Sequence, residues 1–165
     1  MLLSQVPPGF TRQLRAGLQP ILAERRLQVF YQVETLIFGR AVDRALRPER
    51  YIIGCDDPNA ELPKLYRELL ESCDCPVLRM RYESAELAKI SINVFLAASL
   101  SATNSLAELC EVIGAEWSEI ETALRLDRRI GPHAYLVPGL GIAGGNIERD
   151  LVTVKDLAAK YGAEE

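Results

Sequence analysis

Short apolar runs and amphipathic segments alternate along the first 82 residues. The apolar runs predict four strands, at residues 2–6, 27–33, 51–55 and 77–80. Between them we expect helices after Thr11, within 41–46 and after Asn59, with Thr11 and Asn59 as capping residues. Pro20 should end or kink the first of these helices. Alternating strands and helices are typical of a mainly parallel sheet with crossover helices.

A long helical pattern follows, from Ser84 to Val112, and neither proline nor glycine interrupts it before Gly114. At about 1.5 Å per residue this helix would be about 40–45 Å long. A small domain cannot cover such a helix along one face, so we expect its remaining apolar surface to pack against a second copy of the chain. The sequence therefore predicts a homodimer that forms through this helix.

The rest of the chain reads as helical. A helix that begins near Trp117 is followed by a glycine-rich loop, and a last helix ends at Gly162. The predicted fold class is thus α/β followed by all-α, with domains at residues 1–82 and 83–165.

Composition narrows the function classes. Hydrophobic residues make up 48% and charged residues 25% of the chain, and the net charge of −4 is spread along it. This distribution lacks the basic stripe of a nucleic-acid-binding surface. No continuous apolar run approaches the roughly 20 residues of a membrane helix, and the first five residues do not resemble a signal peptide. We therefore expect a cytoplasmic protein without a membrane or nucleic-acid partner.

The four cysteines do not predict a metal site. Cys73 and Cys75 are two positions apart, Cys55 and Cys110 are isolated, and His133 is the only histidine. Zinc sites use paired C-x-x-C spacing, which is missing, so we expect no metal and reduced thiols.

Gly139, Gly141 and Gly144 form a G-x-G-x-x-G pattern. In a dinucleotide-binding turn this pattern follows a strand, and an acidic residue lies on a second strand about 20 residues later. Here Pro138 precedes the glycines and no strand is predicted after them. We expect a tight loop whose backbone approaches a ligand or another helix.

Six motifs occur in one order along the chain and together resemble the UDP-glucose/GDP-mannose dehydrogenase family. They are Ser4–Thr11, Glu34–Ala41, Arg47–Gly54, Ala85–Lys89 with Asn93, Asp127–Pro132 and Pro138–Asp150. The resemblance covers the end of a Rossmann-like NAD-binding domain and a central dimerisation domain of the 6-phosphogluconate-dehydrogenase type. It implies NAD as cofactor, a nucleotide sugar as substrate, and two oxidations of a sugar C6 alcohol that supply polysaccharide precursors.

The resemblance also implies site residues. The catalytic positions are Glu34, Lys89, Asn93, Asn146 and Asp150. The substrate-binding positions are Arg129, Gly139, Gly141 and Gly144, and Gln5 and Arg149 lie on the cofactor side. From spacing alone, Lys89 and Asn93 would form a solvated helix face, Glu34 and Arg129 would be surface charges, and Asp150 would be a first-turn acid favoured by the helix dipole.

Asn146 is the largest departure from the family pattern, because it occupies the position of the catalytic cysteine. A thiolate forms a thiohemiacetal with the intermediate aldehyde, whereas an amide cannot.

Three hypotheses for the function of the chain remain. It is part of a complete dehydrogenase, a non-catalytic dimerisation module from a degenerate paralogue, or part of an enzyme that stops after one oxidation. We expect the 165-residue chain alone to be inactive, because a complete NAD site is missing.

Overall fold

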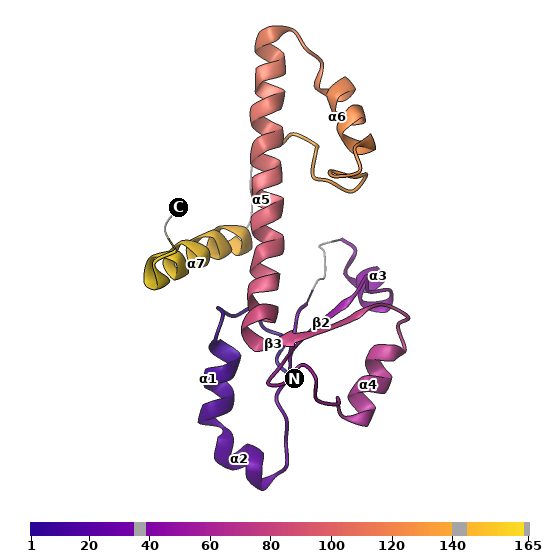
Figure 1. Cartoon of the computed structure of the whole chain (residues 1–165). Helices are drawn as coiled ribbons and strands as arrows, with labels where there is room; N and C mark the ends of the chain where they lie inside the picture. Colours follow the sequence, from indigo (N-terminus) through magenta and orange to yellow (C-terminus); the bar gives the residue numbers. More distant parts are fainter. Residues whose placement is uncertain (35–38, 140–144, 164–165) are drawn as a thin grey trace. The chain divides into compact units, whose positions relative to one another are not determined.

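The computed structural model describes residues 1–34, 39–139 and 145–163 (Figure 1). The chain divides into two compact units, an N-terminal unit of Met1–Lys89 and a C-terminal unit of Ile90–Glu165. The division falls within one helix, and the domain boundary expected after residue 82 stays a prediction.

A small mixed sheet organises the N-terminal unit. Its elements are α1 (Phe10–Gly17), α2 (Gln19–Glu24), β1 (Tyr31–Gln32), α3 (Ala41–Leu46), β2 (Tyr51–Cys55), α4 (Lys64–Glu71) and β3 (Val77–Arg81). The strand order is β1-β2-β3, with β2 parallel to β3 and β1 antiparallel to β2. The strands expected near residues 51–55 and 77–80 are confirmed.

The two earlier apolar runs form less sheet than expected. Of residues 27–33, only Tyr31–Gln32 is a strand, and residues 2–6 contribute a single bridge from Leu2 to Tyr31. An antiparallel β1 makes the sheet mixed. Apolar alternation predicts burial of one face, but strand pairing and direction depend on which neighbour supplies the hydrogen bonds.

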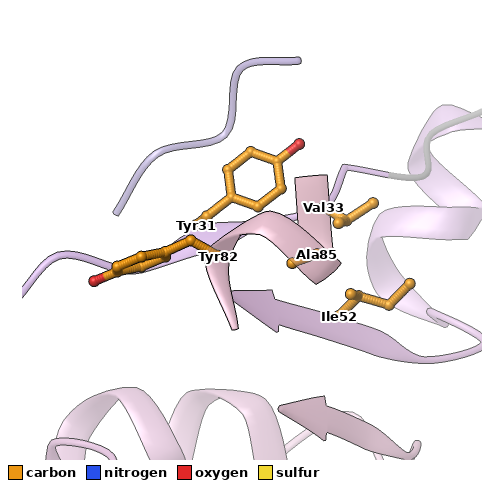
Figure 2. Close-up of a cluster of buried hydrophobic side chains, with 5 residues drawn as sticks. All are labelled: Tyr31, Val33, Ile52, Tyr82 and Ala85. Atoms are coloured by element: carbon orange, nitrogen blue, oxygen red, sulfur yellow. The ribbon is translucent and has the colours of Figure 1, made fainter. Parts of the chain in front are cut away.

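The core on one face of β2 contains Tyr31, Val33, Ile52, Tyr82 and Ala85 (Figure 2). The helix that carries Tyr82 and Ala85 approaches β2 closely at Gly54. A Cβ atom at this glycine would lie 3.1 Å from the Cβ atoms of Ala85 and Tyr31. The missing side chain therefore allows the helix to pack directly on the strand.

A second cluster, of Ile53, Cys55 and Leu70, covers the other face of β2. Successive residues of β2 thus enter different clusters, and four of its five residues are buried. A strand that is covered on both faces reads as a continuous apolar run, which explains the unbroken pattern at Tyr51–Cys55.

Two of the expected helix caps are wrong. Gly9, not Thr11, is the N-cap of α1, and its φ of +93° suits a glycine. The break expected at Pro20 is confirmed, since α1 ends at Gly17 and a separate helix, α2, begins at Gln19 with Pro20 in its first turn, where proline is favoured. Helix α4 begins at Lys64, after Pro63, so Asn59 does not cap it.

The C-terminal unit is helical. It comprises most of α5 (Tyr82–Ile113), with α6 (Trp117–Leu126) and α7 (Gly145–Tyr161). The predicted long helix is confirmed, and Gly114, with a φ of +76°, follows its end. Cys110, Trp117 and Leu136 form the buried cluster of this unit, so Cys110 contributes to packing.

Much of the apolar surface of α5 is uncovered. Phe95 and Val112 are 75% and 79% exposed. Within the described residues, α5 is the one helix long and apolar enough to cross a membrane, by length and composition only. Serine, threonine and asparagine interrupt its apolar runs, yet an 18-residue window has a mean hydropathy of 1.3 and is 17% buried.

Candidate functional site

Asn93 on α5 and Asp150 on α7 are 57 positions apart in the sequence and form a hydrogen bond in the C-terminal unit. The Asn93 Nδ2 donates to the Asp150 Oδ2 over 2.5 Å. Asp150 is buried, with 1% of its surface exposed, while Asn93 is half-buried. Tertiary structure therefore brings together two of the predicted catalytic positions.

The burial of Asp150 excludes its interpretation as a first-turn acid. Helix α7 begins at Gly145, and Glu148 is the acidic residue of its first turn. Asp150 lies in the second turn, where the dipole of the helix has less influence. A buried carboxylate needs hydrogen-bond donors, and Asn93 supplies one of them.

The first two turns of α7 carry two more of the predicted site residues, Asn146 and Arg149. Both side chains are exposed, and the Arg149 Nη2 donates to the Asn146 Oδ1 over 3.3 Å. Since an amide is neutral and weakly nucleophilic, Asn146 offers hydrogen bonding rather than covalent catalysis at this position.

The segment that leads to the glycine loop is tied to α5 and α6 by side chains. The Gly139 N–H donates to the Asn104 Oδ1 over 3.0 Å, and the Thr103 hydroxyl donates to the Tyr135 carbonyl over 2.9 Å. The Trp117 Nε1–H donates to the Leu136 carbonyl over 2.9 Å. Gly141 and Gly144 lie outside the described residues.

Sequence reasoning missed these anchoring roles of Thr103 and Asn104. A signal was present, because both lie in a stretch rich in serine, threonine and asparagine, Ser99–Ser105, on a helix that is otherwise largely apolar. Polar groups that such a helix buries need partners, and here the partners are backbone groups of the segment before the glycines.

Arg129 pairs with its neighbour Asp127, and the Nη2 to Oδ2 distance is 2.6 Å. Its side chain is 88% exposed. The hydrogen bonds from Arg129 lower the pKa of Asp127, and Asp127 in turn raises the pKa of Arg129. Arg129 therefore presents a charged guanidinium to solvent.

Three predicted site residues belong to the N-terminal unit. Gln5 is half-buried in the turn before α1, and Glu34 is exposed directly after Val33. Lys89 is half-buried on α5, at the end of this unit.

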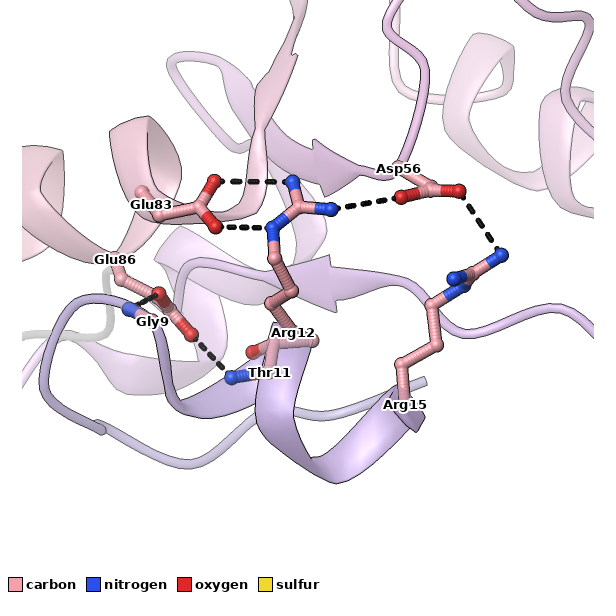
Figure 3. Close-up of polar contacts among 7 residues, drawn as sticks. All are labelled: Gly9, Thr11, Arg12, Arg15, Asp56, Glu83 and Glu86. Atoms are coloured by element: carbon pink, nitrogen blue, oxygen red, sulfur yellow. Dashed lines mark hydrogen bonds and ion pairs between the residues drawn. The ribbon is translucent and has the colours of Figure 1, made fainter. Parts of the chain in front are cut away.

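Glu86 is a buried residue that sequence reasoning did not single out. Its Oε2 accepts a hydrogen bond from the Gly9 N–H over 2.6 Å, and its Oε1 accepts one from the Thr11 N–H over 2.7 Å (Figure 3). The motif Ala85–Lys89 is thereby joined to the motif Ser4–Thr11. The Thr11 hydroxyl itself is buried and has no hydrogen-bond partner among the described residues.

Charged side chains surround this contact at the surface. Arg12 binds both oxygens of Glu83 and also binds Asp56, at 3.0 Å, while Arg15 lies 2.9 Å from Asp56 (Figure 3). The hydrogen bond from Arg12 lowers the pKa of Glu83, and the pKa of Arg12 is raised. These pairs are half-exposed, so each adds little to stability.

The described residues hold no group of three histidine, cysteine or acidic side chains that could bind a metal ion. The four cysteines are free thiols, of which Cys55 and Cys110 are buried. Burial raises the pKa of the Cys55 thiol, which disfavours the thiolate and its nucleophilic chemistry.

Comparison with known proteins identifies the class of protein. A sequence profile of the UDP-glucose/GDP-mannose dehydrogenase family, central domain, matches residues 83–165. The solved UDP-glucose dehydrogenase of Pyrobaculum islandicum superposes with a TM-score of 0.81 and 32% identity, over 96% of this chain and 36% of that one. The fold and the ordered motifs thus place the chain in the class of the nucleotide-sugar dehydrogenases.

Curated relatives agree. UDP-glucose 6-dehydrogenase TuaD of Bacillus subtilis is 31% identical over 160 residues, which is 96% of this chain and 34% of the relative. The rat UDP-glucose 6-dehydrogenase is 33% identical over 136 residues, 78% of this chain and 27% of the relative. The chain belongs to the UDP-glucose/GDP-mannose dehydrogenase family, and it spans about a third of the length of these relatives.

The family assignment confirms the fold class that the sequence predicted. GDP-mannose dehydrogenase of Pseudomonas aeruginosa, at 24% identity and a TM-score of 0.61, shares the same fold. An α/β part followed by a helical part is the architecture common to these proteins and this chain.

Proposed function

We propose that the chain is part of an NAD-dependent nucleotide-sugar dehydrogenase that oxidises the C6 alcohol of a nucleotide sugar, for the synthesis of polysaccharide precursors. The observation that carries this proposal is the hydrogen bond between Asn93 and buried Asp150. These residues come from two separate family motifs, and the contact gives both a fixed geometry. The relatives named above are UDP-glucose 6-dehydrogenases, which makes UDP-glucose the first substrate to test.

The polar residues have distinct chemical capacities. The Lys89 ammonium can stabilise the negative charge that develops on the substrate oxygen when its proton leaves. Asn93, held by Asp150, can donate or accept a hydrogen bond at a defined place. Glu34 is an exposed carboxylate and serves in this proposal as the acid/base group. Arg129 is the cation that contacts the negatively charged substrate.

Asn146 limits the reaction to one oxidation. The first step needs only a proton acceptor and a hydride acceptor, whereas the second passes through an adduct of the aldehyde with a thiolate. Asn146 cannot form that adduct, and none of the four cysteines lies in the glycine loop or on α7. The aldehyde is therefore the expected product of an intact protein with this sequence.

The described residues of the chain do not fit NAD by themselves. A dinucleotide turn needs a strand directly before the first glycine. Here Pro138 and Gly139 follow a coil, and the described part of the C-terminal unit contains only helices and connecting segments. We therefore propose that NAD binds mainly through other parts of the full-length protein, and that Gln5 and Arg149 contact its edge.

The second candidate is a non-catalytic dimerisation module, and the exposed apolar residues of α5 favour it. Phe95, Leu106, Leu109 and Val112 are all more than 45% exposed. We propose that Ser84–Val112 packs against the same helix of a second copy, in the cytoplasm. Light scattering across a dilution series tests this: a persistent dimer supports it, and a monomer at every concentration contradicts it.

The substrate proposal is tested by NMR titration of the ¹⁵N-labelled chain with UDP-glucose, with UDP as the control. We expect UDP-glucose, but not UDP, to shift the resonances of Asn93, Asn146 and Arg149. An unchanged spectrum at millimolar UDP-glucose would contradict the proposal that UDP-glucose is the substrate. If the 165-residue chain alone reduced NAD to NADH, the proposal that it lacks a complete NAD site would be wrong.

A further inference from the structure

Glu86 carries a carboxylate in a place where charge is costly. The residue is 0% exposed, and a buried carboxylate is tolerated only when hydrogen-bond donors compensate its lost hydration. The donors are the Gly9 and Thr11 N–H groups, at 2.6 and 2.7 Å. Both belong to the beginning of α1, where amides lack partners within the helix and the helix dipole is positive.

These two hydrogen bonds fix one end of the turn that contains Gln5. The other end is fixed at Leu2, whose N–H donates to the Phe30 carbonyl over 2.7 Å. The Leu2 carbonyl also accepts the Gln32 N–H over 2.9 Å. Gln5 lies between the two attachment points, so its position depends on where Glu86 holds Gly9.

Lys89 follows Glu86 by three positions on α5. Residues three apart lie one above the other on a helix, so Glu86 and Lys89 share a face. The side chain that holds the Gln5 turn is thus one helical turn away from the predicted catalytic lysine, within the same compact unit.

We propose that Glu86 is a positioning residue, which fastens the Gln5 turn onto the face of α5 that carries Lys89. The use of this arrangement for a nucleotide sugar rests on the function proposed above. Glu83 provides a matched control, because it is a carboxylate one turn earlier that also contacts α1, but through the half-exposed side chain of Arg12.

The test is amide hydrogen exchange by NMR on the 165-residue chain with Glu86→Gln and Glu83→Gln. First-turn helix amides normally exchange fast. We expect Gly9 and Thr11 to be protected in the parent chain. A glutamine keeps one acceptor oxygen and loses the charge, so protection of at least one amide should fall about tenfold or more, as for a lost charge-assisted hydrogen bond.

Two further measurements distinguish a role of Glu86 in positioning the Gln5 turn from a role in the overall stability of the fold. In Glu86→Gln the side-chain amide resonances of Gln5 should shift, while the amides of Ile52 and Ile53 in β2 stay protected. Glu83→Gln should change none of these signals. Unchanged exchange at Gly9 and Thr11 in a folded Glu86→Gln chain, or equal effects of both variants, would overturn the proposal.

If Glu86→Gln loses protection of β2, Glu86→Asp replaces it, since aspartate keeps the charge but is one methylene shorter. The same criteria then apply. Addition of UDP-glucose tests the proposed function separately. If the parent chain binds it, Glu86→Gln should weaken the affinity about tenfold and Glu83→Gln should not. If the parent chain does not bind, the proposed substrate is wrong, while amide exchange still decides the role of Glu86.

Discussion

Replacement of Asn93 by alanine tests whether its contact with Asp150 holds α7 in place. The change removes a donor at 2.5 Å from a buried carboxylate. Hydrogen bonds to charged groups contribute about 1.5–3 kcal/mol, and because Asn93 is only half-buried we place the loss at the lower end, about 1.5–2 kcal/mol. The free energy of opening α7 should fall by that amount.

Native-state hydrogen exchange measures this free energy directly, because each 1.4 kcal/mol changes the exchange rate about tenfold. We expect the protected amides of α7 to exchange about ten to thirty times faster in Asn93→Ala. Asn104→Ala is the control, since it truncates the same residue type on the same helix but breaks a contact with Gly139 instead. A change of less than about twofold in α7, or an equal change in both variants, would refute the reasoning.

Three other outcomes are expected. Gly54→Ala should lower the free energy of unfolding by about 1–3 kcal/mol in urea denaturation, because its Cβ would lie 3.1 Å from neighbouring Cβ atoms; an unchanged midpoint would contradict the close approach. Trp117→Phe should cost about 1–3 kcal/mol, measured by circular dichroism, because it leaves the Leu136 carbonyl without its indole donor; equal stability would contradict a role for that bond. NMR titration should show a lower pKa for Asp127 than in Arg129→Ala. Because the pKa is depressed in the folded state, the stabilisation is present above the unfolded pKa and is lost as pH falls through the folded one; identical titrations would contradict the pair.

The local sequence sufficed for the longest and most continuous patterns. The unbroken helical pattern from Ser84 predicts α5, the spacing of Trp117, Ile120 and Leu124 predicts α6, and the apolar run Tyr51–Cys55 predicts β2. These patterns are reliable because the burial that they reflect repeats with the period of the element itself. The order of the six family motifs can also be read from the sequence alone.

Helix caps and strand pairing could not be predicted as well from the sequence. Thr11 has the residue type of a cap, yet Gly9 is the N-cap of α1, and the acceptor for the Thr11 N–H is the side chain of Glu86, 75 positions away. A capping propensity describes a side chain and its own backbone, so it cannot register a competing acceptor from a distant helix. The antiparallel direction of β1 likewise depends on which strand lies beside it.

The sequence by itself determined the long helix, the strands β2 and β3, the family and the replacement of the expected cysteine by Asn146. Only the tertiary structure decided that Asn93 meets Asp150, that Asn104 holds Gly139, and that Glu86 holds the turn before α1. The physical reason is that the sequence shows which polar side chains lie on a largely apolar helix. Such a side chain needs a hydrogen-bond partner when the helix is buried. The identity of the partner depends on chain segments that only folding brings within about 3 Å.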